Sequence, residues 1–566
     1  MIDTTNPENG PAFDQWFAGF LDDYLMRRPV SATFLGAHEY DHALPDFSKE
    51  ADADLLASTR DQIVQLDTIP NDGLTEAQIY DRILARGFLE IQLWEVSSPY
   101  FQAGNPSHHT GEAAFSVISL FERDTEPLTD RVESAIRRMA GLPAYFETAR
   151  SRVVHAPLLW TERAIREADA GAEYFTSGIR MLAEERGIDR PAFLAQAQVA
   201  ARAFHEHGVW LRSELSQRRS PFKPAGAEAF ERYLHKGHML PAGQNMQWWF
   251  DYAHDELIET TQEMRELAKS IDWKRSWKEQ LAEIPAHHPT VEHYYQSFGE
   301  VWETTREQAI AAELVTWPDV PVDFAPIPHS DRQAAKGLAY PFARCPPPFG
   351  FHDAHRYFVP PCDAAMPPNE QQAVLRSTND TQIKLDYIIH HAGLGHHVQN
   401  YHAFRANSRV GQMAGTDGAS RVAMFCAGTL VEGWACYANE LMEEIGALSD
   451  LQRLSEAQTR VRIAARAVAD TAIHSGDFTI ERAARFYRDE VGMPASVALG
   501  EAVRNSMFPG TGMASLAGVA GIDELRRQME EKEGAGFTLK SFHDRLLSYG
   551  AIPVTLIAAS MLGAPA

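Results

Sequence analysis

Apolar residues recur at intervals of three and four along almost the whole of this 566-residue chain, and strand-like alternation is scarce. Between Phe13 and Tyr24 they fall at i, i+3, i+4, i+7, i+8 and i+11, which is one face of a helix that must end before Pro29. Thr75 and Gln78 form a capping-box pattern that opens another helix. The same spacing predicts helices across 128–155, 157–186, 190–216 and 246–270. It therefore predicts a mainly α fold.

One stretch, 317–368, departs from this pattern because prolines punctuate it, in WPDVPVDFAPIPHS, CPPPFG and VPPCDAAMPP. Proline at this density stops helices and favours extended or turn structure. We predict a long loop or a short β-hairpin there, either lining a cleft or crossing the surface. No long linker interrupts the chain, so we expect a single domain over 1–566, with one helical lobe at about 1–280 and a second at about 281–566.

The composition limits the classes of partner. The chain has 77 acidic and 52 basic residues and a formal charge of −25, which argues against nucleic acid or an anionic membrane as partner. No run approaches the ~18 apolar residues of a membrane span, and the start of the chain has no signal-peptide pattern. The four cysteines are too scattered for a disulfide framework: Cys345, Cys362, Cys426 and Cys436. We expect a cytoplasmic protein.

The densest chemical signal is HHAGLGHH, which places four imidazoles between His390 and His397. On a regular helix these two residues share a face but lie about 10.5 Å apart along the axis, and His396 lies about 240° around from His390. Both ends can bind one metal ion only if the helix bends. Gly393 and Gly395 are where a bend is allowed, because glycine lacks the Cβ that restricts the backbone. The cluster is therefore either a metal site or a set of half-buried histidines that cap a helix end.

A carboxylate follows about forty residues later. Glu432 opens EGWACY within the apolar helical stretch TLVEGWACYANELMEEIG, and the small Gly433 beside it would let a neighbouring helix approach closely. Glu432 is either a metal ligand or an ordinary glutamate near a helix start. Spacing alone does not separate these two roles.

Three charged or titratable residues share one face of a later helix. Arg466, Asp470 and His474 lie at i, i+4 and i+8. Arg466 or His474 would stabilise an oxyanion or hold a substrate carboxylate. The alternative is an intrahelical network in which Asp470 is the structural member.

Further candidates for substrate contact lie on either side of these segments. Arg504 precedes the turn FPGTG and would bind substrate or form a surface salt bridge. His355 and Tyr357 occur in FHDAHRYFVPP, shortly before the histidine cluster, and are candidates for lining a cleft.

At these residues the chain resembles the bacterial domain-of-unknown-function 885 family, whose motifs are HEAYPGHHxQ and EGWAxYAE. The resemblance extends over nearly the whole chain. It includes FLDDYLMRRPVSATFLGAHEYDHALPDFS near the start, RMAGLPAYFETAR, ARAVADTAIHSGDFTIERAARFY, and the closing segment from FPGTG to GAIPVTLI. It implies a mainly helical fold similar to zinc peptidases that carry HExxH and a glutamate on a following helix.

The resemblance also implies a ligand set. His390 and His396 would be the imidazole ligands and Glu432 the carboxylate ligand of zinc or another divalent transition metal, with His397 as an outer or alternative ligand. Members of the family are regarded as zinc hydrolases or peptidases. We therefore expect a metal-dependent hydrolase that acts on an amide, peptide or related bond of a small molecule or short peptide.

The chain departs from the family's pattern at proton-handling positions. The glutamate of HE is His391, and the other changes are at Leu394, Asn439, Thr511 and Ser515. In a zinc hydrolase that glutamate moves the proton of the attacking water. The departures favour no single chemistry.

Three interpretations of the departures stay open. His391 itself is the base, since imidazole titrates near neutrality. Alternatively the enzyme is a lyase or isomerase, or the metal is structural or absent and the chain is an inactive binding protein. In the first interpretation the catalytic residues are His391, His474 and Arg466. The residues expected to contact substrate are then Arg504, Tyr357 and His355.

Overall fold

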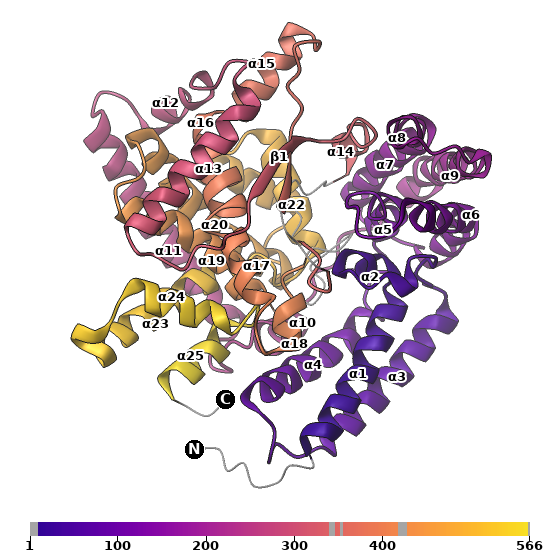
Figure 1. Ribbon diagram of the computed structural model, residues 1–566, viewed down its shortest axis with the longest axis horizontal. Helices are drawn as coiled ribbons and strands as arrows, with labels where there is room; N and C mark the ends of the chain where they lie inside the picture. The colour runs from indigo at the N-terminus through magenta and orange to yellow at the C-terminus, as the bar shows by residue number, and fades with distance from the viewer. Residues whose placement is uncertain (1–8, 339–345, 351–354, 417–426, 564–566) are drawn as a thin grey trace.

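The computed structural model describes residues 9–338, 346–350, 355–416 and 427–563 (Figure 1). The first half contains α1 (Asn9–Arg27), α2 (Pro29–Leu35), η1 (His38–Tyr40), α3 (Lys49–Asp67), α4 (Glu76–Glu95), α5 (Pro106–Ile118), α6 (Leu128–Arg152), α7 (Leu158–Glu173), η2 (Tyr174–Gly178), α8 (Ile179–Arg186), α9 (Pro191–Trp210), η3 (Leu211–Leu215), η4 (Ser216–Arg218), α10 (Ala227–Arg232), η5 (Tyr233–Gly237) and α11 (Met246–Ile271). The fold is mainly α, as predicted.

The second half continues in the same way around one small sheet. It contains α12 (Trp277–Leu281), η6 (Ile284–Ala286), α13 (Tyr294–Ala311), β1 (Val322–Pro326), α14 (Ala334–Gly337), β2 (His355–Val359), α15 (Pro368–Ser377), α16 (Asp380–Gln382), η7 (Ile383–Ala392), α17 (His396–Ala403), α18 (Arg409–Met413), α19 (Gly428–Glu444), α20 (Asp450–Ser475), α21 (Ile480–Phe486), η8 (Tyr487–Val491), α22 (Ala495–Met507), α23 (Ala514–Glu533), η9 (Gly534–Gly536), α24 (Leu539–Ser548) and α25 (Val554–Leu562). Among the described residues, none of these helices combines the length and the apolar run needed to cross a bilayer.

The helices predicted from apolar spacing are confirmed, and their ends follow from local chemistry. α1 ends at Arg27, two residues before Pro29. At the start of α4 the Gln78 amide donates to Thr75 Oγ1 (3.3 Å), and the Thr75 amide donates to Gln78 Oε1 (2.9 Å). This reciprocal pair satisfies two backbone donors that a helix start leaves without partners.

The proline-rich stretch contains strands, but they do not form a hairpin. β1 and β2 pair in parallel, with Val322 opposite His355 and Pro326 opposite Val359. A hairpin joins antiparallel strands, whereas parallel strands need a longer crossover, which here includes α14. The prediction of a β-hairpin was therefore wrong in the direction of pairing and right in placing extended structure there.

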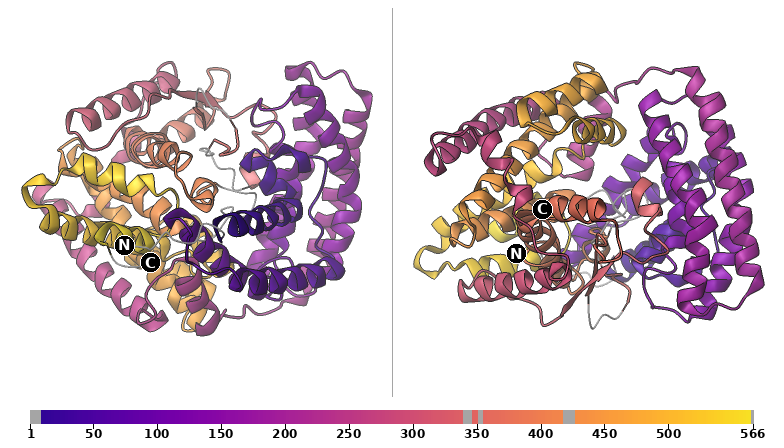
Figure 2. Two further views of the ribbon diagram at one scale, coloured as in Figure 1. Left: turned by 60° about the horizontal axis from the view of Figure 1, so that its bottom comes forward. Right: turned by 90° about the horizontal axis from the view of Figure 1, so that it is seen from above.

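Among the described residues, three of the four hydrophobic cores combine segments from both halves of the chain, and the fourth, which includes Tyr294 and Ile388, lies within the second half. One core joins Phe13, Phe17 and Phe88 to residues of α19, α24 and α25, and another joins α11 to α20. Figure 2 shows the first helices beside the orange and yellow elements of the second half. Three of the cores thus extend across residue 280, where we placed a boundary between lobes.

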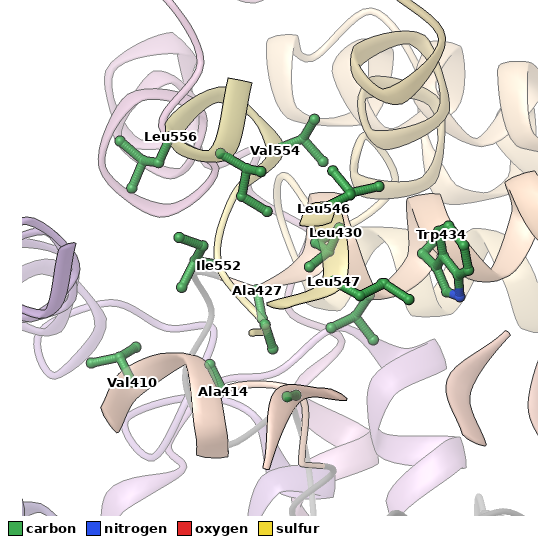
Figure 3. Close-up of a cluster of buried hydrophobic side chains, with 14 of the residues drawn as sticks. Val410, Ala414, Ala427, Leu430, Trp434, Leu546, Leu547, Ile552, Val554 and Leu556 are labelled. Carbon is green, nitrogen blue, oxygen red and sulfur yellow. The ribbon is translucent and has the colours of Figure 1, made fainter. Parts of the chain in front are cut away.

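Part of the first core lies beside the histidine-bearing segment. Figure 3 shows Leu430 and Trp434 of α19 among side chains from α18, α24 and α25. α19 also packs tightly on α23, because a Cβ on Gly433 would stand 2.6 Å from the Cα of Gly518. The close helix approach expected at Gly433 is confirmed, and it fixes the position of α19.

Two sequence predictions fall partly outside the described residues. Cys362 and Cys436 are free and buried, whereas Cys345 and Cys426 lie outside the described residues. Residues 1–8, which bear on the prediction of no signal peptide, also lie outside them.

Candidate metal centre

The histidine cluster is divided between two helices that meet at a bend. His390 and His391 end η7, which is π-helical, and His396 begins α17. The residues between them leave helical geometry, with φ −126° and ψ −120° at Gly393 and φ −72° and ψ −113° at Gly395. The bend predicted at the two glycines is confirmed.

Gly395 allows the bend because its backbone passes close to the end of η7. A Cβ at this position would stand 1.9 Å from the carbonyl oxygen of His390. The amide of Gly395 donates to the carbonyl of Ile389 at 2.7 Å. A larger residue would push the two halves of the cluster apart.

Two tryptophans from distant helices hold the bend. Nε1 of Trp302 on α13 donates to the Ala392 carbonyl at 2.7 Å. Nε1 of Trp434 on α19 donates to the carbonyls of Leu394 (2.9 Å) and Gly395 (3.2 Å). The carbonyls of Ala392 and Leu394 lie where η7 stops, so they have no partner in a continuing helix, whereas the carbonyl of Gly395 also accepts from the Gln399 amide of α17 at 3.0 Å. The indoles therefore stabilise the geometry that brings the histidines together.

The bend brings three imidazoles together. One ligand nitrogen from each of His390, His391 and His396 lies within 4.8 Å of the other two. The ring centroid of His390 lies 4.6 Å from that of His391 and 4.9 Å from that of His396. Three nitrogen donors this close match the protein ligands of a catalytic zinc site with an open position.

The hydrogen bond of His391 selects its tautomer. Its Nδ1 lies 2.7 Å from the backbone carbonyl of Asp386, which can only accept, so Nδ1 carries the proton. Nε2 is then left with its lone pair. A backbone carbonyl that orients the second nitrogen in this way is usual for histidines that bind metals.

The other two histidines are held neutral. Burial lowers the pKa of His390 well below its usual value, and the neighbouring His391 and His396 lower it further. Burial also lowers the pKa of His396 to about 4, although the charge of Glu432 opposes this. His396 Nδ1 is buried without a hydrogen-bond partner. Neutral imidazoles present the lone pairs that a metal ion needs.

Glu432 and His397 take different places from the three histidines. Glu432 lies near enough to act on the charge of His396, but among the described residues it is not in the group whose ligand atoms lie within 4.8 Å. His397 instead pairs with His355, with 3.2 Å between their Nδ1 atoms and stacked rings. Of the strand residues predicted to contact substrate, Tyr357 packs against His391, with ring centroids 6.3 Å apart.

Two of the predicted residues on α20 are engaged in holding a turn. His474 is fully buried, and its Nε2 donates to the Asn505 carbonyl (3.0 Å) while its Nδ1 accepts from the Ala225 amide (3.4 Å). Asp470 accepts from the amides of Gly510 and Gly512 in the FPGTG turn, at 3.3 and 2.9 Å. Both nitrogens of His474 are therefore occupied away from the histidine group.

Arg466 is the residue of this trio that acts on the histidine group. It forms an ion pair with Glu501 of α22, and its charge contributes to the lowered pKa of His390. Arg504 on the same helix lowers the pKa of Glu501, together with Arg466. Arg462, one turn before Arg466, also lowers the pKa of His390. Sequence reasoning missed Arg462, although its i−4 spacing from Arg466 was a usable signal.

Comparisons with known proteins identify relatives but no activity. The family described as "Bacterial protein of unknown function (DUF885)" matches residues 29–561. The fold is similar to "a putative lipoprotein of unknown function" from Shewanella oneidensis, with 22% identity and a TM-score of 0.77, over 97% of this chain and 99% of that one. It is also similar to "the putative lipoprotein" from Colwellia psychrerythraea, with 15% identity and a TM-score of 0.77, over 100% and 99%. No curated protein matches the chain.

Proposed function

The chain belongs to the DUF885 family of bacterial proteins of unknown function, and from this premise we propose that it is a metal-dependent hydrolase, with zinc as the metal, that cleaves an amide, peptide or related bond of a small substrate. The observation that carries the proposal is the convergence of His390, His391 and His396 within 4.8 Å. A zinc ion held by three nitrogens polarises a carbonyl group and activates water.

The donor set of this site fits such an ion. All three donors are imidazole nitrogens, which suit zinc and other late transition metals. The Nδ1 of His396 is buried without a hydrogen-bond partner. The imidazole of His391 is oriented by the bond from its Nδ1 to the Asp386 carbonyl, which leaves the lone pair of its Nε2 available. A purely structural helix cap would instead use these nitrogens in hydrogen bonds to the chain.

The geometry favours exchanging the roles expected from the sequence for two residues, so that His391 is a ligand and Glu432 is the base. His391 belongs to the ligand group, and Glu432 lies beside it. We assign His390, His391 and His396 as ligands, and Glu432 as the base that moves the proton of the attacking water, because a carboxylate near the centre is suited to that task. Arg466 stabilises negative charge that develops on the substrate.

Metal content tests the ligand assignment. Purified protein is expected to bind close to one equivalent of zinc, and substitution of His390, His391 or His396 by alanine should abolish binding. His402→Ala is the matched control, since His402 lies on α17 and bonds to the carbonyl of Thr316. Absence of zinc binding by the wild-type protein would contradict the proposal.

A second variant separates the roles of Glu432 and His391. Glu432→Gln should keep zinc and lose hydrolysis of a model amide. Loss of zinc in Glu432→Gln with retention in His391→Ala would restore the assignment expected from the sequence. A zinc-loaded protein that converts metabolites without hydrolysing any bond would instead indicate a lyase or isomerase. Protein without metal would indicate a binding protein.

A further inference from the structure

We propose that the substrate of this centre carries a carboxylate, and that Arg462 on α20 binds it. The inference rests on the proposed function, because it takes the histidine group as the place of the reaction. Arg462 is not one of the proposed metal ligands and the carboxylate is not the metal, so carboxylate binding and zinc binding can be tested separately.

Arg462 differs from the other arginines of α20 in its contacts. Arg453 and Arg460 form ion pairs with Glu443, and Arg466 forms one with Glu501. Arg462 makes no ion pair or hydrogen bond with the described residues, and its Nε is buried without a partner. The side chain as a whole is only half-buried, so the guanidinium stays accessible to a ligand. A buried guanidinium nitrogen without a partner is costly, and an anionic ligand would reduce that cost.

Arg462 lies beside the histidine group. It stands one turn before Arg466 on α20, so both share a face of the helix. Its charge acts on His390 and Asp386 of η7 and on Glu501 of α22. The guanidinium therefore lies near the end of η7 that carries His390, and it supplies none of the three imidazole nitrogens.

The charge balance around Arg462 favours a singly charged anion. Arg466 is paired with Glu501, Glu432 adds a negative charge near Arg466, and Asp386 and Glu501 act on Arg462. The two arginines are therefore balanced by carboxylates, which would repel a doubly charged phosphate more strongly than a singly charged carboxylate. The planar guanidinium fork matches a carboxylate in shape, so a substrate such as an N-acylated amino acid fits the site.

Binding to metal-free protein tests this inference independently of zinc. The probes are N-acetylglycine and its neutral counterpart N-acetylglycinamide, measured by isothermal titration calorimetry on protein treated with a chelator. N-acetylglycine should bind roughly 10- to 100-fold more tightly, as expected for a charge-assisted hydrogen bond. Equal binding, or no binding of N-acetylglycine, would overturn the proposal even if zinc binds as expected.

Variants then test the assignment to Arg462. Arg462→Met should remove the preference for the carboxylate, and Arg462→Lys should restore part of it. Arg453→Met is the control, because Arg453 lies on the same helix and pairs with Glu443 and Asp450. A preference that survives in Arg462→Met would overturn the assignment. The comparison of the two probes on wild-type protein stands even if a variant unfolds.

Discussion

A single indole donor connects α19 to the bend of the histidine segment. Trp434 donates to the carbonyls of Leu394 and Gly395, and the carbonyl of Gly395 immediately precedes His396. It acts on the histidines only through the backbone, so it is a positioning residue. Trp434 therefore orients the segment that carries His396 and would itself contribute no donor atom to a bound metal ion.

Trp434→Phe should therefore weaken zinc binding by about 10- to 100-fold, because the N–H that orients the bend is lost. The smaller ring also leaves a cavity at this buried position, so circular dichroism must show that the variant is folded. Competition with a chromophoric chelator measures the affinity. Trp273→Phe is the control, since Trp273 is 78% exposed. Unchanged affinity in Trp434→Phe would show that the bend does not need this donor.

A buried carboxyl on α20 makes stability depend on pH. Burial raises the pKa of Glu456 to about 7, although Arg460 opposes the rise, and Glu456 Oε2 has no hydrogen-bond partner. The folded-state pKa lies above the unfolded value of 4.5. The contribution of this group to stability is therefore complete below pH 4.5 and is lost as the pH rises through about 7.

Glu456→Gln stays neutral at every pH and should remove this loss. The Tm of Glu456→Gln minus that of wild type should therefore increase between pH 5 and pH 8, by on the order of 1–2 °C in a chain of this size. Thermal unfolding followed by circular dichroism at the two pH values measures the difference. The same measurement on Glu206→Gln, an exposed position on α9, should show no such change.

At the scale of elements, the π-helix η7 and the turn that follows it set the geometry of the three histidines. Within this π-helical segment, the Nδ1 of the His391 side chain donates to the backbone carbonyl of Asp386, which orients the imidazole. π-helical turns are frequent at functional sites. The bend then depends on the absence of a Cβ at Gly395.

Gly395→Ala should displace His390 from His396 and abolish stoichiometric zinc binding, and it should also lower Tm. Metal analysis and thermal unfolding measure the two effects. Gly299→Ala, on the neighbouring α13, is the control, because nothing lies within 4 Å of its added Cβ. In a helix interior that change should stabilise by up to about 1 kcal/mol. Retention of zinc by Gly395→Ala would refute the role of the bend.

At the scale of the whole molecule, the cores make the two halves of the chain depend on each other. α11 lies along α20, and Phe13, Phe17 and Phe88 pack in one core with Trp434 and Ile557. Separating the halves at residue 280 would expose these apolar faces to water. Cooperative folding of the whole chain follows from this arrangement.

We therefore expect one unfolding transition for the full chain, and we expect a fragment of residues 281–566 expressed alone to be unfolded or aggregated. Calorimetry of the full chain and circular dichroism of the fragment test this. A soluble, helical fragment with its own sharp transition would show that the second half is an independent domain. Addition of zinc should not rescue the fragment, because the missing contacts lie in the core.

The local residues of the histidine segment predicted part of the site. The spacing of His390, His396 and His397 showed that a bend was needed, and Gly393 and Gly395 showed where. The family resemblance led us to choose His396 over His397, and in the structure His396 lies with His390 and His391 while His397 lies against His355. The tautomer of His391 had no signal in the sequence, because it depends on π-helical geometry.

The sequence by itself determined the helical fold, its caps and the place of the bend, because apolar periodicity, capping and the steric freedom of glycine act over a few residues. The tertiary structure alone decided that His391 lies with His390 and His396, that among the described residues Glu432 is outside this group, and that Trp302 holds the bend from 90 residues away. It also decided that Arg462 has no ion-pair partner among the described residues. These outcomes depend on how helices distant in the chain pack together, and packing sets distances that residue spacing does not contain.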